Sequence, residues 1–282
     1  METKQNPFSF YDFLGYFVPG SLFVYLLISI ASHSTIKDSP LLKFINLSEL
    51  KGVELYTPLI ILAYISGHFI NFLSAMTVEK HLNWMYGFPS KTLLGIYQDS
   101  YFTSGEDSKK KNSVRAIIAI LLLPISAVDF FVNYALGIKS LINKELDPML
   151  KTILKQKIVS ILSISAGLES PPQEPVKETN YFLFIYHYAL ENSKNHVPKM
   201  QNYVALFGLM RTLTFYFVIL FWVATWHFIY SNAGIIVTSA TLTSLIFISY
   251  TFYLSFIKFY RRFTLEALMA SAVACPGEGA KD

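Results

Sequence analysis

The sequence predicts an all-α membrane protein with four transmembrane helices and a helical cytoplasmic domain. Of its 282 residues, 53% are hydrophobic and only 15% are charged, whereas soluble domains carry about 25% charged residues. The mean hydropathy of +0.41 is correspondingly high. The 24 Phe, 18 Tyr and 3 Trp residues suit a chain with many rings at membrane interfaces. A net charge of +4 is too small to indicate a nucleic-acid-binding protein.

Two N-terminal segments are long and apolar enough to cross a bilayer. Residues 12–32 are nearly uncharged after Asp12, and about 20 apolar residues cover a hydrocarbon core of roughly 30 Å. The segment lacks a positively charged start and a small-residue cleavage site, so we expect a retained helix and not a signal peptide. Residues 53–78 form the second predicted span.

Two more predicted spans lie close together near the C-terminus, at residues 202–230 and 233–257. Only Ser231 and Asn232 separate them. Because so short a connection cannot return across a bilayer, the two helices must form an antiparallel hairpin.

A fifth apolar stretch, residues 116–138, contains Pro124 and Asp129 and is ambiguous. Basic residues gather before it, between residues 79 and 115: Lys80, Lys91, Lys109, Lys110, Lys111 and Arg115. The positive-inside rule therefore places this region in the cytoplasm. A fifth span would move later basic residues outside, and an ionised Asp129 at mid-membrane would cost about 2.5 to 3.5 kcal/mol. We expect four spans with both termini cytoplasmic, and residues 116–138 either buried in the cytoplasmic domain or lying at the membrane surface.

This topology divides the chain into four parts: an N-terminal transmembrane hairpin (1–78), a cytoplasmic helical domain (79–201), a C-terminal transmembrane hairpin (202–257) and a cytoplasmic basic tail (258–282). Within the cytoplasmic domain, residues 104–113 are polar without an apolar period and predict a loop. The Pro-rich stretch 169–179 predicts an irregular connector. Residues 140–164 and 180–193 predict helices from the spacing of their apolar residues.

Catalytic and metal-binding patterns are weak. No Walker loop or Rossmann glycine pattern occurs, so we expect neither an enzyme nor a bound cofactor. The single cysteine excludes a disulfide within the chain. His187, Glu191 and His196 invite comparison with a metal site, but their polar surroundings favour a solvated or interfacial helix, and we expect no metal.

The start of the first span combines an acid with a Pro-Gly pair. Asp12 is expected to cap free N–H groups at the helix start, or alternatively to form a salt bridge with Arg211 or Arg261 that holds the hairpins together. Pro19 and Gly20 are expected to kink the span and to let another helix approach closely. We expect Arg211 to extend to the cytoplasmic interface.

Two polar stripes could line a pore. In the second span Tyr64, His68, Asn71 and Ala75 share one helix face, which favours hydrogen bonding between helices over a hydrated pathway. In the fourth span the hydroxyls lie on one stripe and suit either a narrow pore or close helix packing: Thr241, Ser244, Thr251 and Ser255. His68, Asn71 and these four residues are the pore-lining candidates.

The lysine triplet Lys109, Lys110 and Lys111 is a candidate regulatory site. Lysines in a loop are usually just solvated, but they also contact anionic lipid headgroups or a phosphate ligand.

Several stretches together resemble a loose group of bacterial multi-pass inner-membrane proteins. They are YDFLGYFVPG (11–20), YHYAL (186–190), QNYVALFGLMRTL (201–213) and KFYRRFTLEALMA (258–270). Several members of that group resemble membrane effectors of antiphage defence systems such as Hailong. The resemblance implies a homo-oligomer, which we expect to be a tetramer, forming a channel that injures the host membrane during infection. It also implies control by a companion enzyme and its nucleotide or oligonucleotide product, which favours the ligand interpretation of the lysines. The competing function is a non-conducting membrane scaffold that recruits a soluble partner, and a remote third is a lipid-modifying enzyme.

Overall fold

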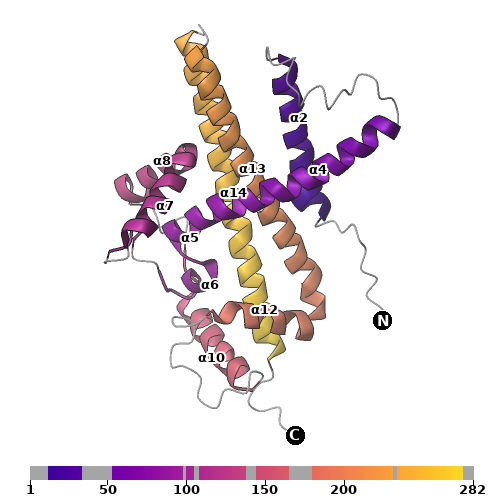
Figure 1. Ribbon diagram of the computed structural model, residues 1–282. Coiled ribbons are helices and arrows are strands. Elements are labelled where there is room, and N and C mark those ends of the chain that lie inside the picture. Colours follow the sequence, from indigo (N-terminus) through magenta and orange to yellow (C-terminus); the bar gives the residue numbers. More distant parts are fainter. Residues whose placement is uncertain are drawn as a thin grey trace.

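The computed structural model describes residues 12–33, 53–97, 100–104, 108–137, 144–164, 180–230 and 234–275 (Figure 1). Within these ranges every regular element is helical, as predicted, and no strand occurs. The predicted connector at 169–179, the turn at Ser231 and Asn232, and the end of the chain from residue 276 lie outside the described residues.

Three helical stretches of the described chain are long and apolar enough to cross a membrane: Tyr56–Thr92, Lys194–Tyr230 and Ile235–Ala274. They include the second, third and fourth predicted spans. The first predicted span corresponds to a shorter apolar helix, Phe13–Ser29. The chain is therefore an all-α membrane protein that crosses the bilayer several times.

The N-terminal pair crosses at two glycines. A π-helical turn, η1 (Phe13–Phe17), leads into α2 (Val18–His33), which packs against α4 (Val53–Ser74). A Cβ atom on Gly20 would overlap the carbonyl oxygen of Ala63, and one on Gly67 would overlap the carbonyl oxygen of Tyr16. The close helix approach expected at Gly20 is therefore present, and its partner is α4.

Helix α4 runs obliquely across the C-terminal hairpin and continues past the predicted end of its span (Figure 1). A second π-helical turn, η3 (Ala75–Glu79), leads into α5 (Lys80–Tyr86), and the short α6 (Pro89–Thr92) follows Gly87. Gly87 has a φ of 83°, a backbone conformation that favours glycine. This stretch leads the chain from α4 toward the helices at the bottom of Figure 1.

The C-terminal hairpin consists of two long helices, α13 (Val197–Tyr230) and α14 (Ile235–Ala274). They pack along each other through most of their length, and α14 ends beside α12 (Tyr181–Asn192) (Figure 1). The part of the predicted basic tail from residue 258 to Ala274 is helical, because it is the last 17 of the 40 residues of α14, and its cytoplasmic location stays a prediction. Phe263, Ala267 and Leu268 bury their side chains there against the lower helices, which stabilises the extension.

The ambiguous stretch forms a bent hairpin beside α13 and α14. Helix α7 (Ser108–Leu121) and α8 (Leu123–Phe130) with η4 (Phe131–Ala135) meet at an angle of 107°. The hairpin lies against α13 and α14, where Trp222 and Tyr250 form hydrogen bonds with it, and its position relative to the membrane stays a prediction. The predicted loop at 104–113 is wrong from Ser108 onward. Lysine is a good helix former, and Asn112 fixes this end of the helix by hydrogen bonds with Thr103.

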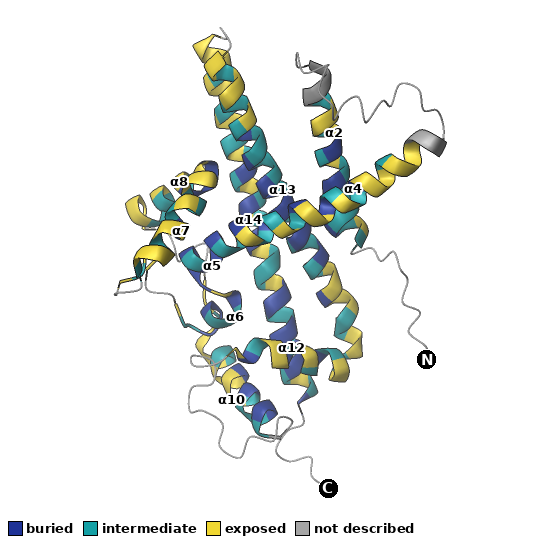
Figure 2. Ribbon diagram, viewed as in Figure 1, coloured by how far each residue is buried: buried dark blue, intermediate teal, exposed yellow. Residues whose placement is uncertain are grey.

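The helices at the bottom of Figure 1 form a lower layer. They are the two helices predicted within the cytoplasmic domain, α10 (Pro148–Ile164) and α12 (Tyr181–Asn192), with the short η5 (Lys194–His196). Tyr181 joins α12 to α6, because its hydroxyl donates to the carbonyl oxygen of Ser90 at 2.5 Å. Burial raises the pKa of Tyr181 above its usual range, so the hydroxyl keeps its proton and remains a donor. Figure 2 shows that burial is greatest where α4, α5, α13 and α14 meet, whereas the upper ends of the long helices are exposed.

The glycine crossing can be tested by adding one methyl group. We expect Gly20→Ala or Gly67→Ala to lower stability by about 1 to 3 kcal/mol, because the backbones of α2 and α4 must separate. Gly208→Ala is the matched control, since a Cβ there meets no atom within 4 Å. Thermal unfolding of the purified protein in detergent measures the effect. Equal melting temperatures for all three variants would contradict the close crossing.

Candidate functional site

A buried carboxylate is the centre of the candidate site. Asp129 of α8 is completely inaccessible to solvent. Its Oδ1 atom accepts hydrogen bonds from the hydroxyls of Tyr86, at 2.9 Å, and Tyr250, at 3.2 Å. Its Oδ2 atom lies 3.2 Å from Nε2 of His81, which is equally buried. One side chain thereby joins α5, α8 and α14.

The hydrogen-bond network continues on both sides of Asp129. Nδ1 of His81 lies 3.1 Å from the hydroxyl of Tyr101, and this hydroxyl lies 3.3 Å from the carbonyl oxygen of Arg115. On the other side, Asn133 donates to the hydroxyl of Tyr86 at 3.0 Å. Burial raises the pKa of Tyr101 above its ordinary range, so its hydroxyl is a proton donor at neutral pH. The result is a continuous chain of exchangeable hydrogens inside the protein.

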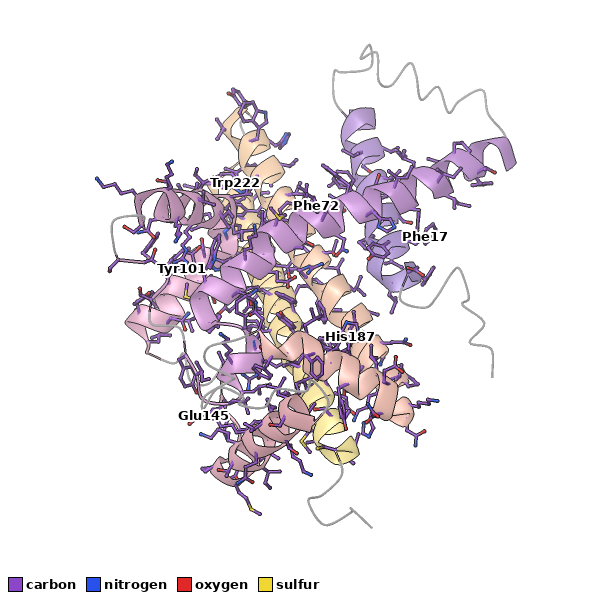
Figure 3. All side chains as sticks on the ribbon, turned by 60° about the horizontal axis from the view of Figure 1, so that its bottom comes forward. Phe17, Phe72, Tyr101, Glu145, His187 and Trp222 are labelled. Carbon is purple, nitrogen blue, oxygen red and sulfur yellow. The ribbon has the colours of Figure 1, made fainter. Side chains whose placement is uncertain are left out.

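Pro124 explains why the hairpin bends where it does. It has no N–H group and stands at the start of α8, so α7 cannot continue through it. The break frees backbone carbonyls, and side chains satisfy two of them. Ser126 donates to the carbonyl oxygen of Ala119 at 2.6 Å, and the indole of Trp222 donates to that of Leu121 at 2.8 Å. Figure 3 labels Tyr101 and Trp222, whose hydrogen bonds reach the middle of α7 at Arg115 and its end at Leu121.

Two further polar groups lie at the network: the hydroxyl of Tyr253 is close enough to interact with Asp129, and the Oδ1 atom of Asn133 has no hydrogen-bond partner among the described residues. The Tyr253 ring is completely buried, with its centre 6.1 Å from that of His81 and 6.0 Å from that of Tyr250.

A second buried cluster joins the N-terminal helices to α13. Arg211 is 7% exposed and forms an ion pair with Glu79. Its guanidinium also donates to Asn71 at 2.5 Å and to Ser74 at 3.3 Å. The expectation that Arg211 extends to the interface is wrong, because carboxylate and amide oxygens inside the protein satisfy its donors.

The other residues predicted at the start of the first span have different environments. Asp12 precedes η1 and makes no side-chain capping hydrogen bond, so the predicted cap is wrong. The acid that pairs with Arg211 is Glu79, and Arg261 donates to the backbone carbonyl of Lys144. Pro19 is buried near the start of α2, directly after the π-helical turn.

The polar face of α4 is partly covered by protein, since Tyr64 and Asn71 are half-buried whereas His68 is exposed. The ring of His68 stacks on that of Tyr16, with centres 3.8 Å apart, and packs edge-on against Tyr64. Asn71 binds Arg211. For Asn71 this agrees with hydrogen bonding between helices, the interpretation that the sequence favoured for this face.

The hydroxyl stripe of α14 lies on the side away from the buried network. Three of its hydroxyls donate to the carbonyl four residues earlier: Ser244 and Thr251 at 2.8 Å, and Ser255 at 3.0 Å. Ser244 and Thr251 are exposed, while Thr241 and Ser255 are partly exposed. At 100° per residue, the stripe is roughly opposite the face that carries Tyr253. The stripe is thus available to lipid or to another molecule.

The sequence singled out Asp129 but not its partners His81, Tyr86 and Tyr250, nor Tyr101, which binds His81. The predicted lysines lie elsewhere, on the exposed first turn of α7. The only available signal was an acid inside an apolar stretch, since such an acid needs polar partners. Among the described residues, no group of three His, Cys, Asp or Glu side chains could hold a metal ion.

Comparison with protein-family models, with curated proteins and with solved structures finds no match to this chain.

The Asp129 network predicts graded effects of substitution. We expect Asp129→Ala to lower stability by about 3 to 5 kcal/mol, because it leaves buried donors without an acceptor. Asp129→Asn should lower stability by a smaller amount, because its amide oxygen still accepts hydrogen bonds from Tyr86 and Tyr250. Thermal unfolding measures both, and Glu191→Ala removes an exposed acid as the control. If Asp129→Ala unfolds at the same temperature as the control, the carboxylate does not organise this part of the fold.

Proposed function

We propose that this protein is a non-enzymatic membrane effector that forms a regulated ion channel. The observation that carries the proposal is the bent hairpin of α7 and α8. Non-helical backbone at membrane depth is tolerated only where it is buried in protein or lines an aqueous cavity. Here the break at Leu122 is completely buried and its neighbouring carbonyls bind Ser126 and Trp222. Broken helices that carry a buried ionisable group are typical of ion-handling membrane proteins.

The exposed hydroxyl stripe supports assembly from several copies. The stripe is turned away from the protein's own core, so a pore lined by Thr241, Ser244 and Thr251 requires other copies of the chain around a common axis. A tetramer is the assembly that we propose.

The cellular role follows the resemblance described above. We propose an effector of bacterial antiphage defence that depolarises the inner membrane and has both termini in the cytoplasm. Control by a nucleotide or oligonucleotide from a companion enzyme is part of this proposal. The lower helices α10 and α12 are well placed to transmit such control, because both pack against the continuation of α14.

A non-conducting scaffold is the second candidate, and one observation favours it. The hydroxyls of Ser244, Thr251 and Ser255 are already satisfied by their own helix. Such hydroxyls can face lipid or a neighbouring helix at little cost. The stripe could then serve for packing alone, without water.

Substitution of the hydroxyl-stripe residues distinguishes the channel from the scaffold. We expect the triple variant Thr241→Leu, Ser244→Leu and Thr251→Leu to lower ion flux through reconstituted vesicles at least tenfold at unchanged oligomer size. Leucine removes the polar lining, and a hydrophobic constriction excludes water. The control is Ser239→Leu with Thr243→Leu, two exposed hydroxyl positions off the stripe. Normal flux in the triple variant, or no flux from the unsubstituted protein, would favour the scaffold.

The four-span topology makes a separate prediction. Reporter fusions after Asp107 and after Asp282 should both be active in the cytoplasm, because lysine and arginine concentrate in these regions. Paired cytoplasmic and periplasmic reporters measure this in living bacteria. Periplasmic activity at either position would exclude the proposed topology.

A further inference from the structure

The lysine triplet lies at the head of an exposed apolar stripe on α7. Lys109, Lys110 and Lys111 are exposed on the first turn of the helix. Val114 and Ile117 follow Lys110 at intervals of four and three residues, and Leu121 comes four residues later, so all four lie on one helix face. The exposed fractions of the apolar members are 51% for Val114, 65% for Ile117 and 41% for Leu121. One face of α7 thus changes from cationic to apolar over about 16 Å.

The opposite face of α7 is fixed to the protein, so this stripe is held outward. Asn112 accepts a hydrogen bond from the backbone N–H of Thr103 at 3.0 Å and donates to its carbonyl oxygen at 2.9 Å. Arg115 is buried, donates to the carbonyl oxygen of Tyr101 and lies 5.2 Å from the centre of the Trp84 ring. These contacts anchor the helix immediately after the lysines.

The apolar surface continues beyond α7 without a covering element of the described chain. Residues of α8, η4 and the turn that follows expose large apolar side chains: Leu123 at 42%, Phe131 at 59%, Tyr134 at 67% and Leu136 at 53%. The hairpin also contacts α13 at Trp222, within a helix long and apolar enough to span a membrane. A surface of this composition, beside a helix of that kind, is suited to contact the acyl chains of lipids.

We propose that the α7 surface, Lys109–Lys111 together with Val114, Ile117 and Leu121, binds phospholipids with anionic headgroups. The lysines would contact the phosphate and headgroup charge, and the apolar residues would contact the acyl chains. A free phosphate compound would use the lysines alone and would leave the apolar part without a role. Headgroup and acyl chain lie in the same order in a phospholipid as the charged and apolar residues along this helix. The surface therefore selects anionic lipid at the point where the hairpin enters the membrane.

The experiment measures which lipid surrounds α7. The full chain carrying Val114→Cys is labelled there with a bimane fluorophore, and Cys275 is left in place because it is buried. The protein is reconstituted in phosphatidylcholine vesicles that contain brominated phosphatidylcholine or brominated phosphatidylglycerol at equal mole fraction. Quenching by each lipid gives the relative association constant. We expect about a fivefold preference for phosphatidylglycerol, the effect of one lysine in effective contact with an anionic surface.

Variants and salt identify the charges responsible. The preference should fall to about one in the variant Lys109→Gln, Lys110→Gln and Lys111→Gln. It should remain in the matched control Lys155→Gln, Lys194→Gln and Arg262→Gln, which removes three exposed charges elsewhere. Raising the salt concentration should weaken the preference of the unsubstituted chain, because exposed charges are screened.

Three results would overturn the proposal. They are equal quenching by the two lipids, a preference that survives in the lysine variant, and loss of the preference on adding inorganic phosphate at matched ionic strength. The last result would assign the lysines to a free phosphate ligand. None of these measurements depends on ion conduction, so the proposed channel and the lipid surface can fail independently.

Discussion

Burial of the Asp129 carboxylate is the constraint on which the central part of the structure depends. Removing such a group from water is costly unless donors replace its hydration. The donors come from Tyr86 on α5 and Tyr250 on α14, with His81 beside them. Because these helices are far apart in the sequence, the acid can be satisfied only in one arrangement of the hairpin against α5 and α14. The polar network thereby selects a unique packing that apolar contacts alone would leave less defined.

The second buried cluster is joined to the first by a very short segment. Glu79, which pairs with Arg211, and His81, which lies beside Asp129, are only two residues apart. The π-helical turn η3 ends at Glu79, so the change from π-helix to α-helix occurs between the two clusters. Local widening of a helix alters which side chains share a face, and such turns are frequent at functional sites. A shift of α4 would therefore be transmitted through this π-helical turn both to α13 and to the hairpin of α7 and α8.

The sequence was informative where a signal was local. Three of the four predicted spans correspond to helices long and apolar enough to cross a membrane, because their apolar runs are long. Helices α10 and α12 were predicted because their apolar residues recur at helical spacing. Asp129 drew notice as an acid in an apolar run, but its partners His81 and Tyr250 lie 48 and 121 residues away, where no pattern marks them. Similarly, Gly20 predicted a close helix contact without identifying Gly67. The helical turn at Lys109 depends on Asn112 and Thr103, a tertiary contact that periodicity does not reveal.

Helix α14 extends without interruption through 40 residues, and no glycine or proline occurs between Ile235 and Ala274. Its length of about 60 Å is twice the thickness of a bilayer core. Near one end Leu268 is clamped among the lower helices, while at the other Ile235 is 83% exposed. A stiff rod of this kind has no joint in which to absorb torsion. Any rotation imposed about its axis at the clamped end must turn the far end through a similar angle, so torque applied outside the bilayer is delivered to its opposite surface.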